Sequence, residues 1–196
     1  MKEISDLNEL KKIELDIMKK VHLFCNKNNI TYFLCYGTLL GAIRHNGFIP
    51  WDDDIDIFMP MEDYDRFCKE FPKFQDNLNL QLVNSSTKIY YGRTMSKVIN
   101  NNTVLIENDF KHDDPIGVFI DIWPLSGLPN SNAKRNIYIV LHDFLFKLYC
   151  ATIYKLKCDS LKHALAIVFG NIIPRKLILC ILERLDNKFS YKASKY

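Results

Sequence analysis

Apolar residues recur at steps of three and four along several stretches of the chain, and this spacing predicts amphipathic helices. The longest stretch opens the chain and ends at Asn28-Asn29. A short helix is expected before Asn46-Gly47, a pair typical of turns. In the C-terminal part the pattern fills two stretches, and Pro174 interrupts the second because proline lacks a backbone donor. The predicted helices are 4–29, 39–45, 61–71, 132–157 and 161–187.

Short runs rich in β-branched and aromatic residues lie between these helices and predict strands. The clearest is residues 118–123, which Pro124 closes. The predicted strands are 30–36, 54–59, 78–83, 90–99, 103–107 and 118–123. This mixture predicts an α+β (α/β) fold, in which helices flank a mixed sheet. We expect a core, residues 1–131, and a helical C-terminal region, residues 132–196, packed on that core.

The composition indicates a folded chain whose charges are distributed unevenly along the sequence. Apolar residues make up 48% of the 196 positions and charged residues 25%, which is typical of globular proteins and excludes an acidic disordered chain. The net charge of +3 gives no support for nucleic-acid binding. Residues 1–133 carry a net charge of −5, however, and residues 134–196 carry +8. This basic, apolar C-terminal region suits either peripheral contact with a membrane surface or a pair of core helices, and we favour core helices.

Cysteine usage and the N-terminus indicate the compartment. None of the six cysteines forms a C-x-x-C pair, so we expect reduced thiols in the cytoplasm and no structural zinc site. The first twenty residues are charged throughout and lack the apolar run of a secretory signal. No 18-residue run is free of charges and helix breakers, so a transmembrane helix is not expected.

The most informative segment is the acidic run that enters the strand predicted at 54–59. Side chains alternate along a strand, so Asp54 and Asp56 point to one face while Ile55 and Ile57 point to the other. Two like charges held rigidly on one face repel each other unless a cation neutralises them. Oxygen ligands suit Mg²⁺ or Mn²⁺. The alternative is a solvated acidic loop, which would not need the interleaved isoleucines, and we therefore predict a metal site at Asp54 and Asp56.

A glycine–threonine turn precedes this acidic run. Gly37 and Thr38 lie between a predicted strand and a predicted helix, where free backbone N–H groups and the helix dipole favour an anion. Alone, such a turn is more often a helix cap. Ahead of an aspartate pair, it predicts a phosphate site. Arg44, at the end of the short helix, either holds phosphate or interacts with the helix dipole.

A third acidic position lies in the strand predicted at 118–123. Asp121 is the only charged residue in that strand, and a buried carboxylate needs a partner. The partner is either a basic residue, in a core salt bridge, or the cation at Asp54 and Asp56. We favour the second alternative, which makes Asp121 a third ligand.

Two segments together carry a resemblance to a known family. The run YGTLLGAIRHNGFIPWDDDIDI and the later IDIWPL resemble the signature of the LicD family, which includes the fukutins. The resemblance covers roughly residues 8–130 and is densest around 32–67. It implies a polymerase β-type nucleotidyltransferase-like fold, phosphate binding at Gly37 and Thr38, and a catalytic metal triad of Asp54, Asp56 and Asp121. Lys97 is similar to a basic position of the family.

The resemblance also implies an activity. Members of the family move a phospho-alcohol from a CDP-linked donor to a hydroxyl of a glycan, so we expect Mg²⁺ or Mn²⁺, a CDP-choline-type donor and an acceptor of the lipopolysaccharide or teichoic acid type. The expected location is the cytoplasm, at the inner face of the membrane. Two alternatives are a nucleotidyltransferase that uses a nucleoside triphosphate and an inactive module that binds nucleotide-alcohols. Members of the family usually extend further at the C-terminus than this chain does.

Overall fold

The structure is a computed structural model that forms two compact units. It describes residues 6–84, 87, 95–106, 115–155, 168–170 and 172–195. One unit contains residues 1–106 and 115–125, and the other contains residues 107–114 and 126–196. The first unit holds a sheet with its helices, and the second is helical where it is described. Each unit is treated separately below.

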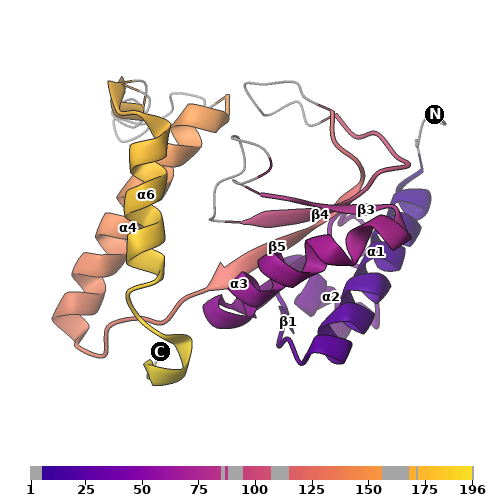
Figure 1. Ribbon diagram of the computed structural model, residues 1–196, viewed down its shortest axis with the longest axis horizontal. Helices are drawn as coiled ribbons and strands as arrows, with labels where there is room; N and C mark the ends of the chain where they lie inside the picture. Colours follow the sequence, from indigo (N-terminus) through magenta and orange to yellow (C-terminus); the bar gives the residue numbers. More distant parts are fainter. Residues whose placement is uncertain are drawn as a thin grey trace. The chain divides into compact units, whose positions relative to one another are not determined.

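A five-stranded mixed sheet organises the first unit (Figure 1). The strand order is β1-β2-β5-β4-β3, in which β2 and β5 are parallel and the other pairs are antiparallel. The strands are β1 Phe33–Leu34, β2 Asp56–Pro60, β3 Leu80–Val83, β4 Ser96–Asn100 and β5 Phe119–Leu125. Together with the flanking helices, this mixed sheet confirms the predicted α+β class.

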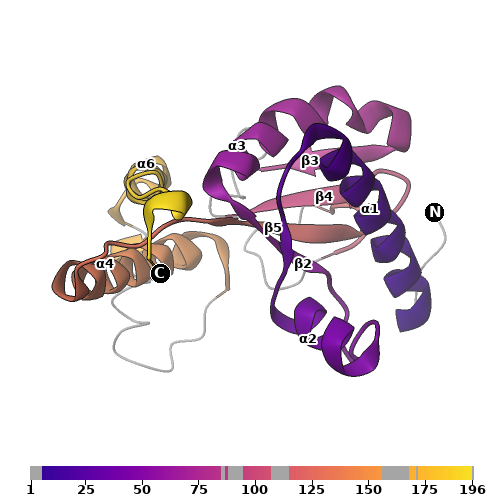
Figure 2. The ribbon, with the colours of Figure 1, turned by 90° about the horizontal axis from the view of Figure 1, so that it is seen from below.

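Helices cover one face of that sheet. The helical segments of this unit are α1 Leu7–Asn28, α2 Tyr36–His45, α3 Met61–Glu70, η1 Phe71–Lys73 and η2 Gln75–Leu78. Helices α1 and α3 lie against the same face, as Figures 1 and 2 show. Asp6 caps the start of α1 by accepting a hydrogen bond from the backbone N–H of Asn8. At the other end of α1, Arg66 of α3 donates to the carbonyls of Asn28 and Asn29.

The core lies between these helices and the sheet. Ile57 of β2 and Ile122 of β5 are fully buried, and they belong to one cluster with Val21 of α1 and Phe67 of α3. Phe67 packs edge-to-face against Phe24 at 5.7 Å between ring centroids. Because strand side chains alternate, burying Ile57 and Ile122 on the helix-covered face puts Asp56 and Asp121 on the other face.

Local departures from the predicted elements have identifiable causes. The strand predicted at 30–36 is confined to Phe33–Leu34, because the left-handed backbone of Tyr36, with φ of 47°, ends the extended conformation where α2 begins. The strand predicted at 103–107 is reduced, in the described part, to a single bridge between Leu105 and Ile116. The first five residues of the strand predicted at 90–99 lie outside the described residues, and β4 covers most of the remainder.

The second unit is built on two long helices. Its described elements are α4 Asn132–Ile153, α6 Arg175–Asp186 and η3 Tyr191–Ala193. The end of α4 meets the start of α6, where Arg175 donates to the hydroxyl and carbonyl oxygens of Thr152. Nearer the other ends, His142 Nε2 lies 2.9 Å from Asp186 Oδ1. The helices are therefore antiparallel. Residues 156–167 of the predicted helical stretches lie outside the described residues, and α6 follows Pro174 as expected.

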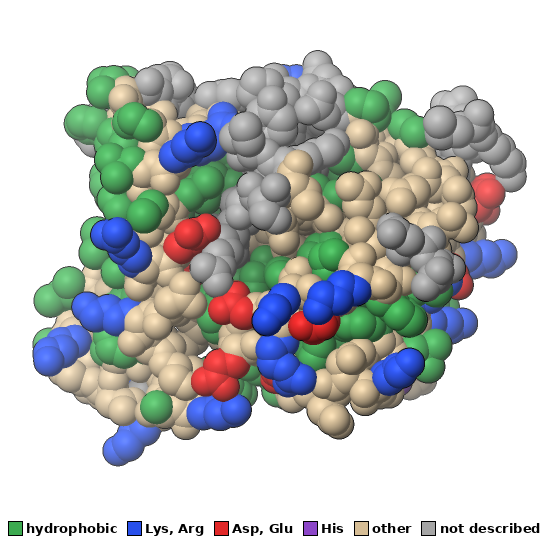
Figure 3. Space-filling model, in the orientation of Figure 1, with side chains coloured by type: hydrophobic (Ala, Val, Ile, Leu, Met, Phe, Trp, Pro, Cys, Tyr) green, Lys and Arg blue, Asp and Glu red, His purple; other side chains and the backbone are tan. Residues whose placement is uncertain are grey.

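The second unit exposes many hydrophobic side chains. On the face shown in Figure 3, hydrophobic side chains alternate with Lys and Arg over α4 and α6. Ile137, Val140 and Ile172 are each about 70% exposed. Among the described residues, α4 is long and apolar enough to cross a membrane, a test that core helices also pass. The sequence expectation used a stricter criterion, a run free of charges, which α4 does not meet, and it stays a prediction. The five cysteines in the described residues are unpaired, as predicted.

Replacing Phe67 by alanine tests the core. The change leaves a cavity beneath Phe24, and we expect it to lower the free energy of unfolding by about 3–5 kcal/mol. Urea unfolding followed by circular dichroism measures this loss. The matched control is Leu23→Ala on α1, where the side chain is 66% exposed, and the expected loss there is about 0.5 kcal/mol or less. Equal losses in the two variants would contradict the described core.

Candidate functional site

Three charged side chains form a row across the middle of the sheet. Asp56 pairs with Asp121 in the parallel register of β2 and β5, and Lys97 pairs with Asp121 in the antiparallel register of β4 and β5. Residues paired in this way share a face, so all three side chains lie on the face opposite α1 and α3. The exposed fraction is 7% for Asp56, 8% for Asp121 and 3% for Lys97, so all three residues are buried. Pairing therefore brings two predicted metal ligands and the predicted basic residue together.

Each member of this row has a defined contact. Lys97 Nζ lies 3.1 Å from Oδ1 of Asp121 and 3.1 Å from the centroid of the Phe119 ring. The indole N–H of Trp123 donates to Oδ1 of Asp56 over 2.8 Å. Asp121 thus forms the core salt bridge that the sequence left open as an alternative, and it does so beside Asp56. The two alternatives for Asp121 are compatible.

The glycine–threonine turn lies directly beside this row. Gly37 and Thr38 are in the first turn of α2, and the backbone N–H of Asp56 donates to Oγ1 of Thr38 over 2.8 Å. No side chain caps the start of α2 at Cys35. The first backbone N–H groups of α2 therefore offer donors for an anion at the edge of the row.

Gly37 lies in close contact with the side chain of Asp52. A β-carbon at this position would lie 2.2 Å from Oδ2 of Asp52, closer than any real β-carbon contact. The Asp52 carboxylate therefore lies against the backbone of the turn. This contact joins the acidic run to the predicted phosphate site.

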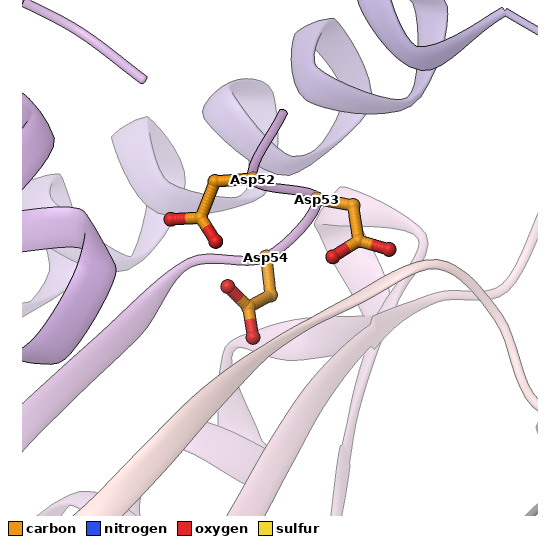
Figure 4. Close-up of side chains that lie close together, drawn as sticks. All are labelled: Asp52, Asp53 and Asp54. Carbon is orange, nitrogen blue, oxygen red and sulfur yellow. The ribbon is translucent and has the colours of Figure 1, made fainter. Parts of the chain in front are cut away.

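The acidic run itself is a loop. Figure 4 shows Asp52, Asp53 and Asp54 on consecutive residues before β2, and a carboxylate oxygen from each lies within 4.8 Å of the other two. Among the described residues, these three aspartates are the group of His, Cys, Asp or Glu side chains that lie close enough together to share a metal ion. The group includes neither Asp56 nor Asp121. Of the predicted triad, the structure therefore gathers Asp56 and Asp121 in the row and Asp54 in the loop cluster.

The reason for this difference is the start of β2. The strand begins at Asp56, so residues 52–54 are not bound by the alternation that the sequence analysis assumed. The sequence analysis assigned no metal-binding role to Asp52 and Asp53, and their grouping with Asp54 was missed. The run of three consecutive carboxylates was the available signal.

Each acidic group in this cluster disfavours the ionised form of its neighbours. Burial, followed by the negative charges of Asp56, Asp52 and Asp53, raises the pKa of Asp54 from 3.8 to about 6. Burial also raises the pKa of Asp56, although the hydrogen bond from Trp123 and the charge of Lys97 act in the opposite direction. Such a cluster gains stability from a bound cation, because the cation removes the repulsion.

Arg44 lies apart from these groups. It is exposed in the last turn of α2, about 10 Å along the helix axis from Gly37 at 1.5 Å per residue. The structure therefore does not bring Arg44 to the turn. Trp51 is also exposed, with its ring edge-on to His45.

Two residues near the site were not singled out from the sequence. Glu14 of α1 is only 3% exposed, and its Oε2 has no hydrogen-bond partner among the described residues. Its place three residues before Ile17 and seven before Val21 puts it on the buried face of α1, a signal that the sequence analysis did not use. Tyr36 has the left-handed backbone noted above, and its ring packs against those of Phe58 and Trp123. Nothing in the sequence marks such a conformation for a tyrosine.

Comparisons with known proteins agree with these features. The family model described as "LicD/FKTN/FKRP, nucleotidyltransferase domain" matches residues 29–149. The lipopolysaccharide cholinephosphotransferase LicD of Haemophilus influenzae is 35% identical over 131 residues, which cover 66% of this chain and 48% of that protein. Mannosyltransferase regulator 4 of Saccharomyces cerevisiae is 26% identical over 143 residues, 69% of this chain and 11% of the yeast protein. The chain thus spans about half the length of the Haemophilus protein and a much smaller share, 11%, of the yeast protein. No solved structure matches it.

Replacing Glu14 by glutamine tests its buried state. Burial, and then the charges of Asp54 and Asp53, raises the pKa of Glu14 from 4.5 to about 8. Between these two pH values the folded protein holds a proton that the unfolded chain releases, so this residue's contribution to stability falls as pH rises. Glutamine is neutral throughout. We expect the free energy of unfolding of the variant, relative to the unmodified protein, to increase from pH 4.5 to about 8 and then level off.

Urea unfolding at several pH values measures this difference. Glu9→Gln, on the same helix but not buried, is the control, and its difference from the unmodified protein should not follow this course. A flat difference for Glu14→Gln would show that Glu14 titrates normally in the folded protein.

Proposed function

Because the chain belongs to the LicD/FKTN/FKRP nucleotidyltransferase-domain family, we propose that it acts as a metal-dependent phosphotransferase. The proposed reaction moves phosphocholine from CDP-choline to a hydroxyl of a glycan of the lipopolysaccharide type. The name of the Haemophilus relative supports this choice of group and acceptor. The observation that carries the proposal is the contact of the Gly37–Thr38 turn with both Asp52 and Asp56.

The turn supplies donors for the diphosphate of the nucleotide. The Thr38 hydroxyl accepts from the backbone of Asp56, so its own proton remains available for a phosphate oxygen. The uncapped N–H groups of α2 and the positive end of the helix dipole act in the same direction. Together they orient the donor so that its reacting phosphorus faces the sheet row.

The carboxylates fit a divalent cation. Three oxygen ligands within 4.8 Å of one another, in a cluster that raises the pKa of Asp54, match the preference of Mg²⁺ and Mn²⁺. We propose Asp54 as the central ligand, together with Asp52 and Asp53 and with Asp56 across the turn. When bound, the cation neutralises charge on the diphosphate and on the leaving group.

Asp121 is proposed as the general base. It accepts the proton of the acceptor hydroxyl as the oxygen of that hydroxyl forms a bond to the phosphorus that carries choline. The bond from this phosphorus to the bridging oxygen breaks, and CMP leaves with the electron pair. Lys97, 3.1 Å from Asp121, fixes the orientation of the carboxylate.

Replacing Asp121 by asparagine tests this role. We expect the rate of CMP release from CDP-choline, with a lipopolysaccharide acceptor, to fall by about 100-fold or more because the proton acceptor is lost. The control is Asp16→Asn, an exposed residue of α1 paired with Lys20, which should leave the rate unchanged. An active Asp121→Asn variant would exclude the proposed base. Release of pyrophosphate from CTP and phosphocholine would instead support the strict nucleotidyltransferase.

Removal of metal tests the cation. Treatment with EDTA should abolish CMP release, and added Mg²⁺ or Mn²⁺ should restore it, whereas Asp54→Asn should require more metal for half-maximal rate because a central ligand is missing. Steady-state rates measured over a metal titration give this value. Full activity in EDTA would contradict the metal-dependent mechanism.

A further inference from the structure

Lys11 of α1 reaches the segment that leads to the acidic loop. Its Nζ donates to the carbonyl oxygens of Ile49 and of Pro50, each over 2.9 Å. The same ammonium lies 5.4 Å from the centroid of the Phe48 ring. Three consecutive residues, Phe48, Ile49 and Pro50, are therefore held by one side chain from a helix almost forty positions earlier.

This segment forms a turn that sets the direction of the acidic loop. The backbone N–H of Asp52 donates to the carbonyl of Ile49 over 3.1 Å. The Ile49 oxygen thus accepts from both Asp52 and Lys11. A hydrogen bond from a charged donor is stronger than one from a neutral donor, so the Lys11 ammonium fixes the direction of the Ile49 carbonyl. Lys11 therefore acts on the turn at the point where Asp52 is positioned.

From Asp52 the contacts continue to the phosphate turn. The Asp52 carboxylate lies against Gly37, where a β-carbon would come within 2.2 Å of Oδ2. The same segment also packs on α2, because a β-carbon at Gly41 would lie 2.9 Å from the backbone nitrogen of Ile49. A continuous set of contacts thus runs from Lys11 through Ile49 and Asp52 to Gly37.

We propose that Lys11 is a positioning residue that holds the acidic loop, Asp52–Asp54, against the Gly37–Thr38 turn. This inference rests on the proposed function for the role of the loop. The contacts that support it are made by Lys11 of α1, which lies outside the residues 29–149 that match the family model. Lys11 acts through the two carbonyls and the turn that they form.

Replacing Lys11 by methionine removes the donors and keeps much of the side-chain stem over Phe48. Two measurements on the whole chain then test the proposal. Hydrogen exchange of the Asp52 amide should accelerate, because its acceptor, the Ile49 carbonyl, is no longer held. Direct Mn²⁺ binding, measured by electron paramagnetic resonance without substrate, should weaken by about 10-fold, as for other residues that orient metal ligands.

Two further variants make the result specific. Lys11→Arg can still donate to two carbonyls and should bind Mn²⁺ more nearly as the unmodified protein does than Lys11→Met does. Lys20→Met removes a lysine from the exposed pair with Asp16 on the same helix and should change neither measurement. The melting temperatures of the three variants identify any general loss of stability, which would affect exchange throughout the first unit rather than at Asp52 alone.

The outcomes separate this inference from the proposed function. Unchanged Asp52 exchange and unchanged Mn²⁺ affinity in Lys11→Met would overturn the positioning role, even if the unmodified protein releases CMP. If the unmodified protein binds no Mn²⁺, the metal proposal fails. The exchange of the Asp52 amide then decides whether Lys11 holds the loop. Faster exchange with ten-fold weaker binding, rescued in Lys11→Arg, supports the role.

Discussion

The parallel pairing of β2 with β5 is the constraint on which the site depends. These strands are adjacent in the sheet although the chain between them forms α3, β3 and β4. Ile57 and Ile122 are buried against the helices, and a slip of either strand by one residue would turn its isoleucine to the other face. The burial of these isoleucines therefore fixes the register that sets Asp56 beside Asp121. The charged row is held in place by hydrophobic packing on the opposite face.

Much of the first unit could be predicted because local patterns and tertiary packing agree there. The long first helix, the helix at α3, and the strands at β2 and β5 follow directly from apolar spacing. Pro124 was expected to close its strand, but β5 continues through Pro124 to Leu125, where it still pairs with β2. The expected strand at 30–36 was too long because the left-handed backbone of Tyr36 ends it early. Such a conformation is decided by packing against Phe58 and Trp123, which are distant in sequence.

The candidate site was predicted in its chemistry more fully than in its geometry. Gly37, Thr38, Asp56, Asp121 and Lys97 meet through strand pairing and the first turn of α2. Arg44 does not join them, because it lies at the far end of a helix whose start the sequence placed too late. The roles of Lys11 and Glu14 depend on how α1 packs, and a single amphipathic pattern does not distinguish a solvated residue from one that reaches a loop.

Helix α1 is fixed at two points that lie on different parts of the first unit. Near its start, Lys11 holds carbonyls before the acidic loop, and at its end, Arg66 of α3 holds the carbonyls of Asn28 and Asn29. A straight helix between two fixed points has a set length and a set phase. One inserted residue would rotate one anchor by about 100° relative to the other and move it by about 1.5 Å. The number of residues between these two contacts therefore determines whether both can form at once. Helix α1 should tolerate substitution on its exposed side far better than any change in length.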